Sequence, residues 1–354
     1  MGGGVIMEVQ DIKKLLKTDS YSFLKEQKNL GNNVILLTLG GSHAYGMETE
    51  QSDVDIRGIA LNTREEILLG TDFEQFVHTE TDTTIYSFQK ILQLLTVSNP
   101  NTIEILGCKP EHYIYVSDIG KELLANKKMF LSKLCVHSFG GYAGAQLRRM
   151  ENKAARVADQ TRNEQYILRS IENAKYDFKH RYYPHNDNDV ELYIAPSERE
   201  GYDSEIFMNV NLQHYPLRDW TGMWNEMKCI VSSYNKLGKR NENAIQHGKL
   251  GKHMAHLLRL YMMCIDILEK EEIITYRSEE HELLMCIRMG EYLDEAKQPT
   301  DAFYDLLNEY EKRLEYAKQN TSLPDVPDYK RINEFKMYVN ERVVKEAVTA
   351  HSYV

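Results

Sequence analysis

Short apolar stretches separated by turn residues occupy the first third of the chain. Short runs rich in β-branched residues and bounded by turn signals are typical of strands. An apolar stripe at three- and four-residue spacing follows, and Asn99-Pro100 closes it as a helix end. The pattern predicts an α/β or α+β domain over residues 1–115, with strands at 34–39, 54–61, 73–78 and 83–86 and a helix at 87–97.

From about residue 117 onward, apolar positions recur at the spacing of amphipathic helices. A polar stretch at residues 183–218 interrupts them; it contains Pro184, Pro196 and Pro216, and we expect a surface loop or a β-hairpin there. The second domain, residues 116–354, is thus predicted to be mostly α-helical with this polar insertion. Its helical segments are expected at 119–158, 162–181, 219–236, 242–270, 279–289, 301–319 and 328–347.

Composition narrows the classes of protein that fit. The chain has 354 residues, of which 42% are hydrophobic, enough for the cores of two domains. No apolar run approaches the roughly 20 residues of a membrane span and no signal peptide is recognisable, so we expect a cytoplasmic protein. The five cysteines lack C-x-x-C spacing, which disfavours a disulfide framework and a zinc ribbon. The net charge of −10 argues against non-specific coating with nucleic acid but is compatible with a local basic groove.

The segment from Thr38 to Arg57 contains the clearest chemistry. Gly40, Gly41 and Ser42 follow the first predicted strand. Glycines at such a position let backbone N–H groups approach phosphate oxygens at the start of a helix. The turn is therefore a candidate cradle for a triphosphate, although Ser42 could instead cap the short helix.

Asp53 and Asp55 lie two residues apart in a stretch with the pattern of a strand, so both carboxylates should project from one face, with Cα atoms about 7 Å apart. Two Mg²⁺ ions held by such oxygens could bridge nucleotide phosphates and bring an attacking hydroxyl into line. Two simpler interpretations stay open. The carboxylates could be solvated loop acids, and Arg57 could neutralise them structurally.

The order of these motifs resembles the DNA polymerase β superfamily of nucleotidyltransferases, whose signature is a Gly-Ser turn, a short helix, a Gly and then D-x-D. One branch, the predicted nucleotidyltransferases often encoded beside RNA ligases in bacteria and phages, is resembled more closely. The resemblance implies an α+β fold in which a mixed sheet with helices precedes a mostly α-helical domain. It rests on G-S-H-A-Y-G, S-D-V-D-I-R-G-I, S-N-P-N-T-I-E-I-L, S-F-G-G-Y-A, K-H-M-A-H-L-L-R-L and I-R-M-G, within roughly residues 34–290.

The resemblance also implies a reaction: transfer of a nucleoside monophosphate from an NTP, such as ATP, to a hydroxyl, with release of pyrophosphate. Two Mg²⁺ ions, or Mn²⁺ in their place, would bind at Asp53 and Asp55. Gly40, Gly41 and Ser42 would contact the triphosphate.

The superfamily uses a third carboxylate from a later strand, which helps to bind the metal and can accept the proton of the attacking hydroxyl. We prefer Asp82 because it opens a predicted strand. Glu80 is the nearby substitute, and Glu104, in the stretch N-T-I-E-I, is the alternative farther along the chain.

A basic stripe occurs in the helical half, where Lys252, His256 and Arg259 share one face of a predicted helix. From spacing alone, a solvated helix face is the simpler interpretation. The resemblance to K-H-x-x-H-L-x-R-L instead favours contact with the triphosphate or with phosphates of the acceptor.

The acceptor is the least constrained feature. Because the resembled branch is associated with RNA ligases, we expect an RNA end, such as the 3′ terminus of a tRNA. Nucleotidylation of a protein or of a small molecule would use the same core. A nucleotide-binding protein or toxin–antitoxin partner without catalysis is the alternative from another class, and a phosphohydrolase is disfavoured because its His-Asp pair is missing.

Overall fold

The computed structural model describes residues 7–50, 52–157, 189–196, 204–217, 249–295 and 297–351, together with positions 220, 221, 224, 225 and 228. The chain divides into two units. The first comprises residues 1–145, 255–286 and 305–354, and the second comprises residues 146–254 and 287–304. Every helix within the described residues is too short or too polar to span a bilayer.

A five-stranded mixed sheet, with the strand order β3-β4-β2-β1-β5, forms the centre of the first unit. β1 pairs antiparallel with β2 and β5, β2 pairs parallel with β4, and β3 pairs antiparallel with β4. All residues of β1 are buried, as expected for a strand with neighbours on both edges and helices over both faces. The strands are β1 Val34–Leu39, β2 Ile56–Ala60, β3 Gln75–His78, β4 Thr83–Ser87 and β5 Tyr113–Val116.

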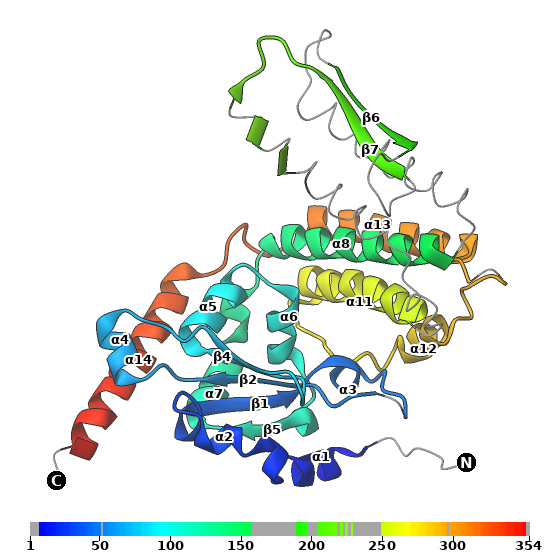
Figure 1. Cartoon of the computed structure of the whole chain (residues 1–354). Helices are drawn as coiled ribbons and strands as arrows, with labels where there is room; N and C mark the ends of the chain where they lie inside the picture. The colour runs from blue at the N-terminus through cyan, green and yellow to red at the C-terminus, as the bar shows by residue number, and fades with distance from the viewer. Residues whose placement is uncertain are drawn as a thin grey trace. The chain divides into compact units, whose positions relative to one another are not determined.

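Helices cover both faces of this sheet (Figure 1). On the side of α1 and α2, Ile12 and Tyr21 join Leu37 and Ile56 in one apolar cluster. On the opposite side, α5 packs against β2 and β4 with an apolar face that includes Phe88. The helices and 3₁₀ turns of this region are α1 Val9–Leu15, η1 Asp19–Tyr21, α2 Phe23–Glu26, η2 Gly31–Asn33, α3 Gly41–Tyr45, α4 Arg64–Leu69, α5 Phe88–Thr96, α6 Pro100–Ile103, η3 Glu104–Gly107, η4 Pro110–His112, α7 Asp118–Ala125 and η5 Lys127–Phe130.

Longer helices make up most of the remaining described chain. Between Met254 and Leu268, α11 buries apolar side chains around most of its circumference, which is typical of a central helix. Because residues 255–286 belong to the first unit, α11 brings its buried Arg259 into the core beside the sheet domain. These helices are α8 Leu134–Val157, α11 Lys249–Lys270, α12 His281–Met289, α13 Asp301–Asn320 and α14 Tyr329–His351.

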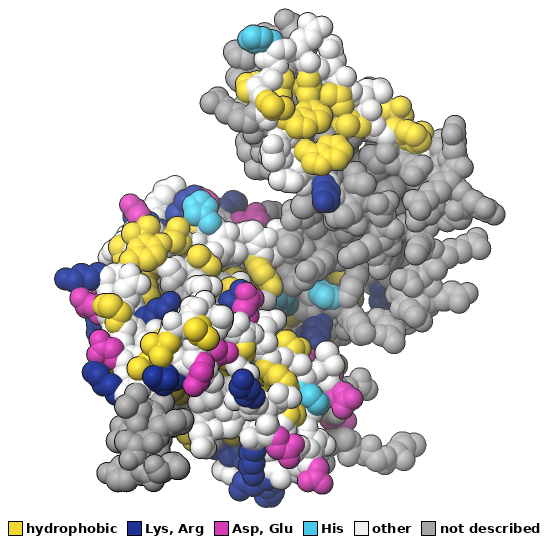
Figure 2. Space-filling model, turned by 60° about the vertical axis from the view of Figure 1, so that its left-hand side comes forward, with side chains coloured by type: hydrophobic (Ala, Val, Ile, Leu, Met, Phe, Trp, Pro, Cys, Tyr) yellow, Lys and Arg dark blue, Asp and Glu magenta, His cyan; other side chains and the backbone are white. Residues whose placement is uncertain are grey.

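The second unit contains an antiparallel hairpin, β6 Asp189–Pro196 paired with β7 Ser204–Asn211. The rings of Tyr193 and Phe207, which face each other across the two strands, stack with centroids 5.7 Å apart. Apolar side chains gather over this hairpin in Figure 2, and Met208 and Val210 are among the exposed ones. Of the two structures expected within residues 183–218, a surface loop or a β-hairpin, the described residues form the hairpin.

The structure confirms the α+β class, the mixed sheet and the strand predicted at 34–39. It corrects the start of the second strand, because the ladder of β2 begins at Ile56 rather than at residue 54. It adds β5, a short edge strand with partly exposed residues, whose apolar pattern was too brief to be recognised. The helix predicted at 87–97 is α5.

The helical stretch predicted at 119–158 was wrong as a single element, because residues 126–133 break it between α7 and α8. Met129 and Phe130 are buried within this break, so the apolar spacing continues although the helix does not. The predicted segments at 279–289, 301–319 and 328–347 correspond to α12, α13 and α14, and 242–270 contains α11. Residues 162–181 and most of 219–236 lie outside the described residues.

Two glycines in helices provide a test of this packing. A Cβ atom on Gly120, in α7, would lie 2.4 Å from the carbonyl oxygen of Ile35 in β1, whereas one on Gly140, in α8, would meet nothing within 4 Å. We expect Gly120→Ala to lower the free energy of unfolding by about 1–3 kcal/mol, because the helix must move away from the sheet. Gly140→Ala should raise it by up to about 1 kcal/mol. Urea denaturation followed by circular dichroism measures both, and equal effects would contradict the packing of α7 on β1.

Candidate active site

A glycine turn connects β1 to the short helix α3. The N–H of Gly40 donates to the carbonyl oxygen of Asp55 over 2.8 Å, which ties the turn to the segment that leads into β2. α3 ends at Gly46, whose φ of 72° is left-handed. The ring of Tyr276 lies 2.5 Å from where a Cβ of Gly46 would be, so a side chain there would collide with it.

The two glycines of the turn make room for two different side chains. A Cβ on Gly41, which has a φ of +54°, would lie 1.7 Å from Oδ2 of Asp55. A Cβ on Gly40 would lie 2.8 Å from Cγ of Arg57. The Gly-Gly pair is therefore required by the close approach of the Asp55 carboxylate and of the Arg57 stem.

The structure brings two of the three predicted carboxylates together. β2 and β4 are parallel, and Ile56 lies opposite Thr83, so Asp55 and Asp82 immediately precede the same ends of neighbouring strands. The N–H of Ile56 donates to the carbonyl oxygen of Asp82 over 3.2 Å. Asp53 is exposed and, like Asp55, precedes the ladder of β2, so the expectation that both lie within a strand was wrong.

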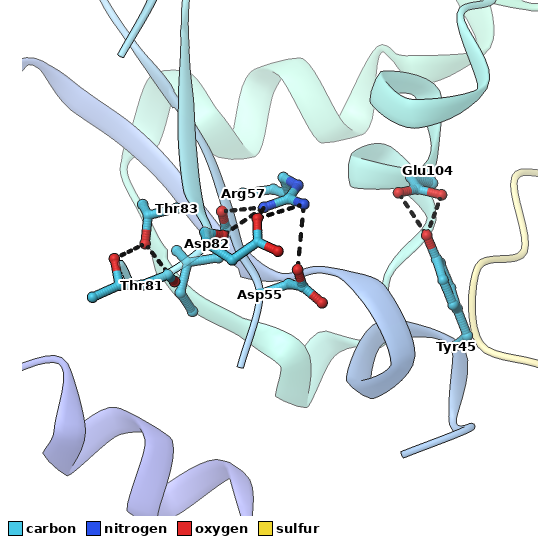
Figure 3. A network of polar contacts seen from close by, with 8 residues as sticks. Tyr45, Asp55, Arg57, Thr81, Asp82, Thr83 and Glu104 are labelled. Carbon is cyan, nitrogen blue, oxygen red and sulfur yellow. Dashed lines mark hydrogen bonds and ion pairs between the residues drawn. The ribbon is translucent and has the colours of Figure 1, made fainter. Parts of the chain in front are cut away.

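Arg57 contacts both carboxylates (Figure 3). Its Nη2 is 3.4 Å from Oδ1 of Asp55, and its Nη1 is 3.3 Å from Oδ1 of Asp82. Nη1 also donates to the carbonyl oxygens of Ile56, over 3.0 Å, and of Asp82, over 2.7 Å. The possibility that Arg57 neutralises the carboxylates is confirmed for Asp55 and extends to Asp82.

The fit of a divalent cation depends on these oxygens. Within the described residues, no group of three or more His, Cys, Asp or Glu side chains is arranged as a metal site. The carboxylate of Asp55 nevertheless lies against the backbone of Gly41. A side chain on residue 41 would occupy the position of that carboxylate. Carboxylate oxygens beside an open glycine backbone suit a hard cation and the phosphates that it carries. Asp55 and Asp82 thus supply the type of ligand that such a cation prefers, and Asp53 stands two residues before Asp55 in the sequence.

Residues 15–184 match the sequence model of the family described as RlaP, RNA repair pathway DNA polymerase beta family. This segment belongs to the DNA polymerase β superfamily of nucleotidyltransferases. The superfamily inferred from the sequence motifs is thus confirmed over the residues that contain the glycine turn and the carboxylates. No curated protein and no solved structure matches the chain. The match ends before α11, so Lys252, His256 and Arg259 lie outside it.

Glu104, the more distant alternative for the third superfamily carboxylate, is buried with partners of its own, and it is close enough to Arg57 for that charge to lower its pKa. The hydroxyl of Tyr45 lies 3.0 Å from each of its carboxylate oxygens, and Nη1 of Arg259 lies 3.3 Å from Oε2. The guanidinium of Arg259 also covers the Tyr45 ring, 3.4 Å from its centroid. Burial raises the pKa of Glu104, and Arg259 and Tyr45 oppose that rise. Glu104 is thus paired within the core, whereas Asp82 is the carboxylate beside Asp55.

The predicted basic stripe does not form one solvated face. Arg259 is only 1% exposed and pairs with Glu104, and its Nη2 lies 3.0 Å from Nδ1 of the half-buried His256. Lys252 is exposed and belongs to the second unit. The spacing placed these residues correctly on one helix, but their burial depends on contacts that spacing does not reveal.

A second polar cluster near the turn was missed by the sequence reasoning. His43, on α3, and His112 are buried, and burial lowers the pKa of both imidazoles. Nδ1 of each ring and Oε2 of Glu48 have no hydrogen-bond partner among the described residues. His43 stood within the motif G-S-H-A-Y-G, but nothing in the spacing connected it with His112.

Gly41→Ala tests the close approach of Asp55 to the turn. Gly70 is the matched control, because its φ of +69° is also left-handed but a Cβ there would meet nothing within 4 Å. Gly70→Ala should cost about 1 kcal/mol of stability from backbone strain alone. Gly41→Ala should cost at least about 2 kcal/mol, because it must also displace the carboxylate. Thermal unfolding at equal salt compares the two variants, and similar losses would show that the contact is absent in solution.

The Glu104–Arg259 pair generates a prediction about pH. Because the pKa of Glu104 in the folded protein is raised above its ordinary 4.5, its contribution to stability is full below that value and is lost as pH rises through the folded pKa. Arg259→Met removes the cation that opposes this rise. We expect it to cost about 3–5 kcal/mol, with a penalty that grows as the pH rises above 4.5. Urea denaturation at a series of pH values from 4.5 upward measures the penalty.

The double variant Glu104→Gln/Arg259→Met is the control for that measurement. It removes both buried charges, so its stability should depend less on pH than that of Arg259→Met alone. A penalty for Arg259→Met that stays constant with pH would contradict an ionisable, unpaired Glu104.

Proposed function

We propose that this protein transfers a nucleoside monophosphate from an NTP to a hydroxyl group in a Mg²⁺-dependent reaction that releases pyrophosphate. The observation that supports this most directly is the carboxylate of Asp55 against the backbone of Gly41, with Asp82 immediately before the start of the adjacent parallel strand β4. Membership of the matched segment in the polymerase β superfamily supplies the reaction class.

Asp53, Asp55 and Asp82 would hold the metal, with Mn²⁺ as a possible substitute for Mg²⁺. Bound there, the ions would neutralise charge on the phosphates and orient the attacking hydroxyl. Asp82 has a largely exposed side chain, so it is accessible to accept a proton from that hydroxyl.

Gly40, Gly41 and Ser42 would contact the triphosphate. Backbone N–H groups can approach phosphate closely where side chains are missing. Contact of Lys252 and His256 with phosphate stays a prediction from the sequence resemblance. The burial of Arg259 and its pairing with Glu104 favour a role in holding α11 against the site over direct contact with a nucleotide.

The proposed acceptor is the end of an RNA, such as the 3′ terminus of a tRNA. The family description refers to RNA repair, and that supports an RNA acceptor over a protein or small molecule. The overall charge of −10 means that such an RNA would be held by local contacts rather than by a basic surface.

The decisive experiment supplies Mg²⁺, each α-³²P-labelled NTP in turn and total RNA, and resolves the products on a denaturing gel. Asp55→Asn should reduce labelling about a thousandfold, because it removes a metal ligand without changing side-chain volume. Asp118→Asn is the control, since it removes an exposed carboxylate from α7. Labelled RNA that disappears only with Asp55→Asn supports the proposal. Label on protein alone would redirect it to protein nucleotidylation, and the absence of label with every acceptor would favour a nucleotide-binding role without catalysis.

A further inference from the structure

Arg57 uses the oxygens that a divalent cation would need. Oδ1 of Asp55 and Oδ1 of Asp82 are each within 3.4 Å of its guanidinium. A cation held between these two carboxylates would have to share or replace those contacts. Two positive charges at such a distance repel each other strongly in a partly buried site.

The position of Arg57 is built into the surrounding backbone. Its stem fills the space over Gly40, where a Cβ would come within 2.8 Å of Cγ. Its Nη1 donates to two carbonyl oxygens, those of Ile56 and Asp82, at the start of the neighbouring strands. The side chain is 21% exposed, so its charge is partly removed from water and its two carboxylate partners compensate for that.

The guanidinium is also suited to a different anion. A planar fork of N–H donors binds phosphate oxygens in two parallel hydrogen bonds, as it binds a carboxylate. The glycine turn that is proposed to contact the triphosphate directly adjoins Arg57 through Gly40. An incoming triphosphate would therefore offer Arg57 an alternative partner within the same site.

We propose that Arg57 is a resident cation that competes with divalent metal for Asp55 and Asp82 and exchanges these carboxylates for the triphosphate of the nucleotide. The inference rests on the proposed function of the site. It implies that the carboxylates bind metal weakly while Arg57 bridges them and more tightly once the guanidinium has turned to phosphate. Metal and nucleotide would then bind cooperatively, because each removes an obstacle to the other.

Binding of Mn²⁺ alone, followed by the electron paramagnetic resonance signal of the free ion, tests the first half of this inference. We expect Arg57→Gln to bind Mn²⁺ at least about tenfold more tightly than the unmodified protein, because a competing charge has been removed. Arg57→Lys keeps the charge but cannot bridge both carboxylates as a fork does, so its affinity should fall between the two. Lys90→Gln is the matched control: it removes a similarly buried cation, paired with Glu74, and should leave Mn²⁺ affinity unchanged.

Binding of ATP in the presence of EDTA tests the second half. Arg57→Gln should weaken this metal-free binding several-fold, because the triphosphate loses its fork of donors. Opposite changes for Mn²⁺ and for ATP are the signature of an exchanging cation. A variant that was merely misfolded would lose affinity for both, and circular dichroism together with Arg57→Lys identifies that case.

The outcomes separate this inference from the proposed function. Mn²⁺ binding that is abolished by Asp55→Asn but is no tighter in Arg57→Gln would overturn the role of Arg57 and leave the metal site standing. ATP binding in EDTA that is equal in the two proteins would overturn the exchange with phosphate. Failure of the folded unmodified protein and of Arg57→Gln to bind Mn²⁺ at all would remove the metal site and, with it, this inference.

Discussion

The burial of Glu104 is the constraint on which the first unit depends. A carboxylate removed from water must be paired and hydrogen-bonded, because an isolated charge in the core would cost several kcal/mol. Arg259 supplies the charge and Tyr45 the hydroxyl, while Thr275 donates to the backbone carbonyl of Glu104 over 2.7 Å. Segments far apart in sequence therefore meet at Glu104, and one of them is α3, the helix that follows the proposed phosphate turn and contains Tyr45.

The carboxylates of the candidate active site also need a compensating positive charge, and a different arginine supplies it. Asp55 and Asp82 lie at the ends of parallel strands, where two carboxylates without a cation would repel each other. Arg57, the second residue of β2 and two residues after Asp55, supplies that cation. Gly40 and Gly41 are then required for packing as well as for the proposed approach of phosphate. Because neither residue has a side chain, there is space for Arg57 beside Gly40 and for Asp55 beside Gly41. In the site that is proposed to bind metal, the charge of Arg57 can thus neutralise the carboxylates when no metal ion is bound.

Much of this arrangement could be predicted from local patterns. A short, nearly continuous apolar run bounded by turn residues predicted β1, and the order of the glycine turn and D-x-D identified the superfamily before any contact was known. Prediction from apolar spacing failed at two places. Met129 and Phe130 keep the helical spacing of apolar residues across the break between α7 and α8, and β5 is too short to show a periodic pattern. Asp53 and Asp55 were predicted to lie in a strand because the sequence pattern is the same just before and just after the point where β2 begins to pair with its neighbours.

The sequence by itself determined the class of the fold, the position of the turn and the carboxylates available for chemistry, because these follow from short-range periodicity and residue type. Only the tertiary structure decided which charges meet. It pairs Arg259 with Glu104 across 155 positions of the chain and Arg57 with Asp82 across 25. Such pairings depend on how strands and helices pack, and a charge receives its partner through that packing rather than through its neighbours in sequence. For that reason Arg259, for which the motif predicted contact with phosphate, is buried and paired with Glu104, and Arg57, two residues after Asp55, contacts both Asp55 and Asp82.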